Sequence, residues 1–249
     1  MSADATWPAG VDRLVLQETD STNAEALRWA RDLKNPIWIC ALRQSAARGR
    51  AGRSWANPEG NFAATLAMRL DEPPAQLALR SFVASLALHD VLADLTPAGT
   101  SLALKWPNDV LLGGGKVAGI LLESTGASPV LAIGFGVNLA RAPTSAEAAP
   151  GAFAPVALAD WAAEPVSPPD FLDRLAQAYA RREAVFTRLG FAPIRHAWLA
   201  HAARLGQQIT ARTTREDVTG IFRTVDENGQ LVLSTRGATV AIPAADVYF

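Results

Sequence analysis

The chain has 249 residues, of which 49% are hydrophobic and 19% charged, so it can bury a sizeable core and is not a disordered protein. Its 23 basic and 24 acidic residues nearly cancel, which argues against coating nucleic acid, because such binding needs excess positive charge. A single cysteine excludes an internal disulfide, and no apolar run approaches the roughly 20 residues of a membrane span. The N-terminus lacks a signal-peptide pattern, so we expect a cytoplasmic protein with no membrane association.

The first part of the chain predicts a mixture of strands and helices. An alternating segment at residues 11–16 and an apolar run at residues 37–42 are typical of strands. Between them, Thr22 and Glu25 have the spacing of a capping box, which predicts that a helix begins there. Further elements are expected as a strand at 61–70, a long helix at 76–95, a strand at 129–138, and helices at 169–189 and 193–203.

A triple glycine at residues 113–115 separates two segments that predict a hairpin. Residues 101–106 are apolar at every second position, and residues 116–123 return as the second strand. After Gly206 the sequence changes to short strands, at 208–213, 218–225, 230–234 and 239–243. These strands predict a small β-barrel, so we expect two domains, at residues 1–205 and 206–249.

The most unusual segment is a polar loop from Gln44 to Trp55, in which three arginines alternate with glycines. Glycine lets backbone N–H groups approach an anion, and arginine offers paired donors to phosphate or carboxylate. The pattern favours a flexible loop that becomes ordered over an anionic ligand, with phosphate the first candidate. A solvated surface loop and an arginine–glycine patch for RNA are the alternatives.

Lysine is rare in this chain. Of the 23 basic residues only three are lysines, Lys34, Lys105 and Lys116, and the last two flank the predicted hairpin tip. A lysine is a compact point charge, whereas arginine is a planar fork. Together with Asn108 and Asp109, the hairpin can hold an amide, a carboxylate and an ammonium at one pocket, where the ammonium would stabilise charge during transfer to phosphorus. The alternative is an ordinary hairpin with a charged tip.

Other chemistry-bearing residues are weaker candidates. The hydroxyls and amides at residues 17–23 suit a polar or anionic ligand but also suit a simple helix cap. His196 and His201 share no ligand position, so we expect no metal site, and His89 is expected to be half-buried or exposed. Cys40 lies in an apolar strand and is expected to be core. The sequence contains neither a serine nucleophile elbow nor a P-loop.

Five segments together resemble biotin protein ligases: residues 21–23, 44–55, 105–109 (Lys-Trp-Pro-Asn-Asp), 116–123 and 134–138, in the family's order. The resemblance implies an α+β fold, with a mixed sheet, flanking helices and a catalytic domain like that of class II aminoacyl-tRNA synthetases. An SH3-like β-barrel would follow. It also implies a reaction with two steps, in which biotin and MgATP give biotinyl-5′-adenylate and pyrophosphate. The biotin then passes to one lysine of a biotin carboxyl carrier protein, as in acetyl-CoA carboxylase.

The resemblance also implies which residues form the site. Biotin would be bound by Ser21, Thr22, Asn23, Gln44, Arg48, Gly49, Arg50 and Lys116. Arg50 and Lys116 would be the catalytic residues, over the carboxylate and the α-phosphate. The nucleotide would be bound by Arg53, Trp55, Asn108, Asp109 and Asn138. ATP and biotin would be substrates, Mg²⁺ would accompany ATP, and no protein-bound metal is implied.

Two features depart from the family's pattern. Ala47 and Ala51 stand where the family's loop commonly has glycine and arginine, and only about ten residues precede the first strand, too few for a helix-turn-helix domain. We therefore expect a monofunctional ligase that does not bind DNA, and the relatives suggest a homodimer. A lipoate or octanoate ligase of the same fold is the closest alternative. A nucleic-acid-binding module and a catalytically silent biotin-binding protein are the others.

Overall fold

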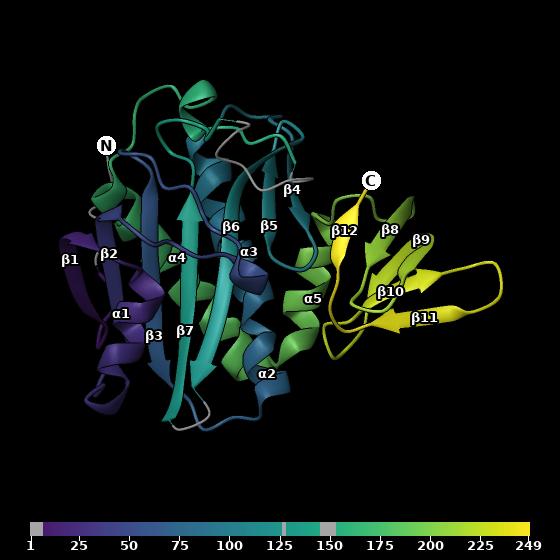
Figure 1. Cartoon of the computed structure of the whole chain (residues 1–249), viewed down its shortest axis with the longest axis horizontal. Helices are drawn as coiled ribbons and strands as arrows, with labels where there is room; N and C mark the ends of the chain where they lie inside the picture. Colours follow the sequence, from purple (N-terminus) through teal and green to yellow (C-terminus); the bar gives the residue numbers. More distant parts are fainter. Residues whose placement is uncertain (1–6, 126–127, 145–152) are drawn as a thin grey trace.

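A computed structural model describes residues 7–125, 128–144 and 153–249. Its larger part is a seven-stranded sheet in the order β1-β2-β3-β7-β6-β5-β4 (Figure 1). β1 and β2 run parallel, and the other neighbouring strands run antiparallel, so the sheet is mixed. The strands are β1 (Asp12–Thr19), β2 (Ile37–Gln44), β3 (Phe62–Arg69), β4 (Leu102–Lys105), β5 (Asp109–Leu112), β6 (Gly115–Thr125) and β7 (Ser128–Val137). This confirms the predicted α+β class.

Helices cover both faces of this sheet, with α1 on one face and α3 and α4 on the other (Figure 1). Because successive strand residues point to opposite faces, Ile37 and Ile39 of β2 pack with α1, whereas Trp38 and Cys40 belong to the main core. Coverage on both sides explains why this strand is apolar at consecutive positions. The helices are α1 (Thr22–Arg28), α2 (Pro74–Ala78), α3 (Arg80–Leu95), α4 (Pro168–Leu189) and α5 (Phe191–Ala200).

Three local predictions are wrong. Ser21, not Thr22, caps α1, and its hydroxyl accepts from the N–H of Ala24, because the Thr22 hydroxyl is engaged with other side chains. The predicted long helix is interrupted at Leu79, between α2 and α3. The predicted hairpin has a further strand, β5, in its tip, so β4, β5 and β6 form three successive antiparallel strands.

The C-terminal part is a five-stranded antiparallel sheet in the order β11-β10-β9-β8-β12. Its strands are β8 (Gln208–Arg212), β9 (Asp217–Val225), β10 (Leu231–Ser234), β11 (Thr239–Ile242) and β12 (Asp246–Tyr248). This module lies beside α5 and β4 (Figure 1), and the indole N–H of Trp106, which follows β4, donates to the carbonyl of Gly229 at 3.0 Å across the junction. β12 is not among the strands predicted from the sequence, because three residues are too few for a period-two pattern.

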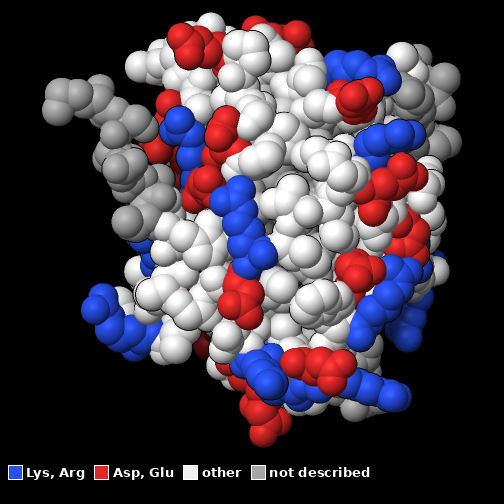
Figure 2. Space-filling model, turned by 90° about the vertical axis from the view of Figure 1, so that its left-hand side faces the viewer, with Lys and Arg blue, Asp and Glu red and all other residues white. Residues whose placement is uncertain are grey.

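The surface on the β1 side of the molecule carries acidic and basic side chains in alternation, with no field of one sign (Figure 2). This distribution agrees with the net charge of −1. Within the described residues, no helix combines the length and the apolar character that crossing a membrane requires.

His89 is buried in α3, contrary to the prediction, and its ring centroid lies 3.9 Å from that of His201. Burial lowers the pKa of His89 to about 4, and His201 and Arg182 act in the same direction, whereas Asp90 opposes them. The imidazole therefore stays neutral in the folded protein at pH values where a free histidine takes up a proton.

We expect the protein to lose stability as the pH falls from about 6.5 toward 4. In this window the unfolded chain binds a proton at residue 89 that the folded protein does not, which lowers the free energy of unfolding by up to ~3 kcal/mol. Urea-unfolding midpoints across this pH range should fall more steeply for the wild type than for His89→Gln. Parallel curves for the two proteins would show that His89 does not contribute.

Candidate active site

A pocket of about 170 Å³ opens where the large sheet meets the C-terminal module. It is lined by the start of α1, the Arg-Gly loop (residues 44–55), the β4–β5 turn, β6, β7 and β12. The residues that the sequence predicts for the site all lie on its wall: Ser21, Thr22, Asn23, Gln44, Arg48, Gly49, Arg50, Arg53, Trp55, Asn108, Asp109, Lys116 and Asn138. Segments far apart in the sequence therefore converge on one cavity.

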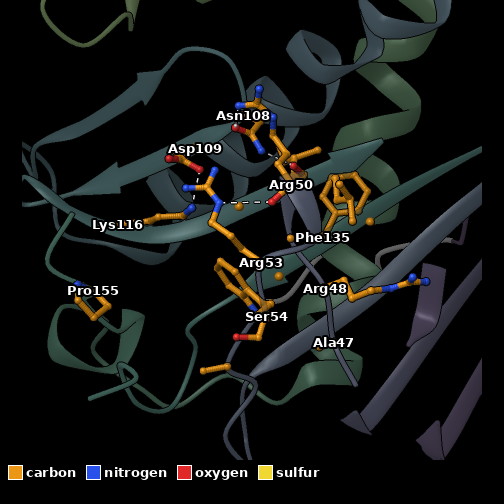
Figure 3. Close-up of a pocket in the computed structure, with 18 of the residues that line it drawn as sticks. Ala47, Arg48, Arg50, Arg53, Ser54, Asn108, Asp109, Lys116, Phe135 and Pro155 are labelled. Atoms are coloured by element: carbon orange, nitrogen blue, oxygen red, sulfur yellow. Dashed lines mark hydrogen bonds and ion pairs between the residues drawn. The ribbon is translucent and has the colours of Figure 1, made fainter. Parts of the chain in front are cut away.

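Two of the three lysines of the chain meet at one carboxylate in this pocket. Nζ of Lys116 lies 2.6 Å from Oδ1 of Asp109, and Nζ of Lys105 lies 3.4 Å from Oδ2. Figure 3 shows the side chains of Lys116, Asp109 and Arg53 turned toward a common space. Lys105 is not among the predicted site residues, although the rarity of lysine and its place beside the hairpin were available signals.

The charges of this cluster are coupled. Burial raises the pKa of the Asp109 carboxyl, but the ammonium groups of Lys116 and Lys105 outweigh burial and hold that pKa below its usual range. Burial lowers the pKa of Lys105, and Asp109 partly offsets this effect. Asp109 is therefore ionised at neutral pH, and it pairs with the Lys116 ammonium in the pocket.

The Arg-Gly loop folds back on itself. The N–H of Gly49 donates to the carbonyl of Arg53 at 2.7 Å, and the N–H of Trp55 donates to the carbonyl of Ala47 at 3.0 Å. Gly52, with φ of +71°, supplies the left-handed conformation that this tight turn requires. The loop thus has a defined shape, with its arginines projecting from a short turn.

Two arginines of the loop reach toward the C-terminal module. Nη1 of Arg50 lies 3.4 Å from Oδ1 of Asn108 and 3.7 Å from Asp246, and Nη2 of Arg53 lies 3.0 Å from the same carboxylate. Arg48 extends away from Arg50 and Arg53 in Figure 3, so the structure does not bring its guanidinium to Lys116 and Asp109. Asp246 is not among the predicted site residues, because no local pattern links β12 to a loop 193 residues earlier.

Trp55 packs against the backbone of two strands. A Cβ at Gly136 would lie 2.6 Å from its indole, and one at Gly119 would lie 3.1 Å away. Nζ of Lys116 is 5.3 Å from the indole centroid, a cation–π distance. Glycine at these two positions is therefore what lets the indole lie against the sheet at the wall of the pocket.

Hydrogen-bonded polar side chains run from the start of α1 into the core. Oε1 of Gln44 accepts from the N–H of Thr22 at 2.8 Å and lies 3.1 Å from its hydroxyl. Oγ1 of Thr65 lies 2.8 Å from the Thr22 hydroxyl and 2.6 Å from Oδ1 of Asn23. Nδ2 of Asn23 donates to the Glu123 carboxylate at 2.8 Å. Thr65 is not among the predicted site residues, because its only signal in the sequence is a lone hydroxyl in an apolar strand.

The two asparagines predicted for the nucleotide use their amide N–H groups within the protein. Nδ2 of Asn108 donates to the carbonyl of Ile120 at 2.6 Å, and Nδ2 of Asn138 donates to the carbonyl of Val156 at 3.1 Å. Asn138 is 1% exposed, so its amide positions the segment around Val156 on the pocket wall.

The fold and the pocket define an α+β domain whose cation-rich site is completed by a C-terminal β module. Residues 15–139 match the biotin/lipoate A/B protein ligase family, and residues 205–249 match the biotin protein ligase C-terminal domain. The chain therefore belongs to the biotin protein ligases of the biotin/lipoate A/B protein ligase family.

Individual relatives agree with this placement. The chain is 50% identical to the biotin–acetyl-CoA-carboxylase ligase of Paracoccus denitrificans, over 94% of this chain and 99% of that protein. It is 34% identical to the ligase of the same description from Mycobacterium tuberculosis, over 94% and 87%. The structure of a biotin protein ligase from Aquifex aeolicus in complex with biotin and ATP shares the fold, with a TM-score of 0.82 at 21% identity, over 95% of this chain and 98% of that one.

Proposed function

We propose that this protein uses ATP to activate biotin as biotinyl-5′-adenylate and then transfers biotin to a lysine of the biotin carboxyl carrier protein of acetyl-CoA carboxylase. The 50% identity to the Paracoccus ligase over nearly the whole of both chains supports the reaction and the acceptor. The structural observation that carries the proposal is one pocket in which Arg50, Arg53, Lys105 and Lys116 converge near the hydroxyl and amide groups of the α1 terminus.

In the first step, an oxygen of the biotin carboxylate forms a bond to the α-phosphorus of ATP, and the bond from that phosphorus to pyrophosphate breaks. Negative charge increases on the α-phosphate oxygens during this exchange. We assign Lys116 and Arg50 to neutralise it, with Lys116 leaving Asp109 for the ligand. One preorganised donor of this kind lowers a barrier by about 3 kcal/mol. Mg²⁺ enters with ATP as part of the substrate.

In the second step, the amine of the acceptor lysine attacks the acyl carbon, AMP leaves with the bonding pair, and the nitrogen loses a proton to give the amide. No enzyme side chain needs to form a covalent bond. Cys40 is buried in β2, and burial raises the pKa of its thiol to about 12, which confirms the expectation that it is core. Closure of the Arg-Gly loop over the mixed anhydride would protect it from water.

The remaining residues divide between the two substrates. We assign the ureido ring of biotin to Ser21, Thr22, Asn23 and Gln44, with Arg48 and Gly49 covering it from the loop. We assign the nucleotide to Arg53, Trp55, Asn108, Asp109 and Asn138. Trp55 would form a wall of the adenine site, and Asn138 would act indirectly, by positioning the segment around Val156.

Exchange of labelled pyrophosphate into ATP, run separately with biotin, lipoate and octanoate, tests the proposal. Exchange with biotin alone is the expected result. Exchange with lipoate or octanoate would assign the protein to the other acyl ligases of this fold. Absence of exchange with all three acids, from a folded sample supplied with magnesium, would overturn the proposal and leave a catalytically silent binding protein.

A homodimer is a proposal that rests on the resemblance, and the absence of DNA binding is a proposal that rests on the near-balance of 23 basic and 24 acidic residues. Sedimentation velocity with and without biotin and ATP tests the first, and electrophoretic mobility with the protein's own biotin-gene promoters tests the second.

Gly134→Ala should weaken biotin binding while leaving ATP binding unchanged. A Cβ at Gly134 would overlap Oδ1 of Asn23, a buried side chain whose amide is hydrogen-bonded to Thr65 through Oδ1 and to Glu123 through Nδ2. We expect the KM for biotin in the exchange assay to rise about tenfold, from the loss of one or two hydrogen bonds. Gly237→Ala, where a Cβ meets open space, is the matched control. A rise of equal size in the KM for ATP would contradict the assignment of Asn23 to biotin.

A further inference from the structure

Thr65 is a fully buried hydroxyl that does not line the pocket. It lies in β3, and its Oγ1 contacts two residues that do line the pocket, Thr22 at 2.8 Å and Asn23 at 2.6 Å. It therefore acts on any ligand only through these two side chains.

The direction of each hydrogen bond follows from the charges around Asn23. Nδ2 of Asn23 faces two acceptors, the Glu123 carboxylate at 2.8 Å and the carbonyl of Leu121 at 3.3 Å. Oδ1 of the same amide therefore faces Thr65, and it can only accept. Since a hydroxyl has one proton, Thr65 donates it to Asn23 and is left as an acceptor toward Thr22.

The Thr22 proton is consequently directed into the protein toward Thr65 at 2.8 Å, because Oε1 of Gln44 lies farther away, at 3.1 Å, and already accepts the backbone N–H of Thr22. The Gln44 amide is oriented as well, because its Oε1 accepts the backbone N–H of Thr22 at 2.8 Å. The hydrogen-bonding groups left for a ligand are a lone pair on the Thr22 oxygen, which accepts, and the two N–H groups of the Gln44 amide, which donate. An acceptor and a donor at neighbouring positions match the N–H and the carbonyl of a cyclic urea.

We propose that Thr65 is a positioning residue that sets the hydrogen-bond polarity of this end of the pocket. It holds Thr22 as an acceptor for a ring N–H and so selects a cyclic urea over a ring that presents oxygen at that place. A site built for one hydrogen-bond direction rejects the analogue that cannot supply it, because its own polar groups are then unpaired. The inference rests on the proposed function, since the cyclic urea is that of biotin.

The test compares Thr65→Val, which removes the hydroxyl at constant shape, with Thr65→Ser, which keeps it. In the exchange assay, Thr65→Val should raise the KM for biotin about 10- to 100-fold, with the KM for ATP and kcat within about threefold of wild type. Thr65→Ser should stay near the wild-type values. If Thr65→Val does not fold, Thr65→Ala removes the same hydroxyl and is compared with Thr65→Ser instead.

Thr96→Val is the matched control, because it removes another buried hydroxyl, which donates to the carbonyl of Leu92 at 2.9 Å, far from the pocket wall. It should lower the melting temperature without changing the KM for biotin. An unchanged KM for biotin in Thr65→Val, or an equal rise in both KM values, would overturn the inference. A KM for biotin in Thr65→Ser that is as high as in Thr65→Val would also overturn the inference.

The two carbamate analogues of biotin, in which one or the other ring N–H is replaced by oxygen, test the polarity directly. The wild type should bind at least one of them much more weakly than biotin. In Thr65→Val, the ratio of the Kd for that analogue to the Kd for biotin should fall, because the Thr22 hydroxyl is then free to turn and donate a hydrogen bond to the ring oxygen. The same ratio in both proteins would refute the polarity argument. Absence of any biotin-dependent exchange by the wild type would instead refute the proposed function.

Discussion

Lys116→Ala should lower the rate of biotin-dependent pyrophosphate exchange on the order of 10³-fold while the protein stays folded. The ammonium of Lys116 lies in the pocket, 2.6 Å from Asp109 and over the Trp55 ring, with its side chain 23% exposed. Removing it leaves Asp109 paired with Lys105, so no buried charge loses its last partner. The loss should therefore appear in catalysis and not in folding.

The measurement is kcat for exchange, with circular dichroism as the check on folding. Lys34→Ala is the matched control, because Lys34 is an exposed lysine outside the pocket. Lys116→Arg should restore only a small part of the rate, since a planar guanidinium cannot reproduce a compact ammonium beside Trp55 and Asp109. A folded Lys116→Ala protein with wild-type kcat would remove Lys116 from the catalytic role.

Arg50→Gly should reduce adenylate formation by about 10²-fold, since it removes one charge-stabilising donor from the site. Arg50 is placed by its Nη1, which donates at 3.4 Å both to Oδ1 of Asn108 between β4 and β5 and to the carbonyl of Ala245 just before β12. Arg236→Gly removes an exposed arginine of the C-terminal module and should leave exchange unchanged.

Asp246→Asn separates two ways in which Arg50 could act, by neutralising charge on the phosphate or by anchoring the loop to β12. This variant removes the carboxylate that links both loop arginines to β12 but leaves their charges in place. If charge neutralisation is what Arg50 supplies, Asp246→Asn should change the rate far less than Arg50→Gly. Equal losses in the two variants would show that anchoring of the loop, and not its charge, limits the reaction.

The contacts of Asp246 also give the C-terminal module a place in the site. β12 lines the pocket, and its carboxylate lies 3.0 Å from Arg53 and 3.7 Å from Arg50. The Trp106 indole N–H donates to the carbonyl of Gly229 at 3.0 Å on the same boundary. The module therefore completes one wall of the cavity that the catalytic sheet leaves open.

Local patterns in the sequence predicted most of the secondary structure and singled out many of the residues that line the pocket. Period-two and apolar runs predicted the strands, and the alternation of arginine with glycine and the two clustered lysines indicated an anion site. Each of these signals lies within about 15 consecutive residues, where side-chain period and residue type act directly on backbone conformation. The order of the segments along the chain then carried the resemblance to the family.

Only the tertiary structure decided which distant side chains meet. Asp246 reaches the Arg-Gly loop, and Thr65 reaches Thr22 and Asn23, through strand pairing and packing between segments that have no common local pattern. The same holds for the burial of His89 against His201, which depends on how α3 packs at the end of α5. A side chain's partner and hydrogen-bond direction depend on the register and packing of the whole sheet, and these are properties of the assembled core and not of any one segment.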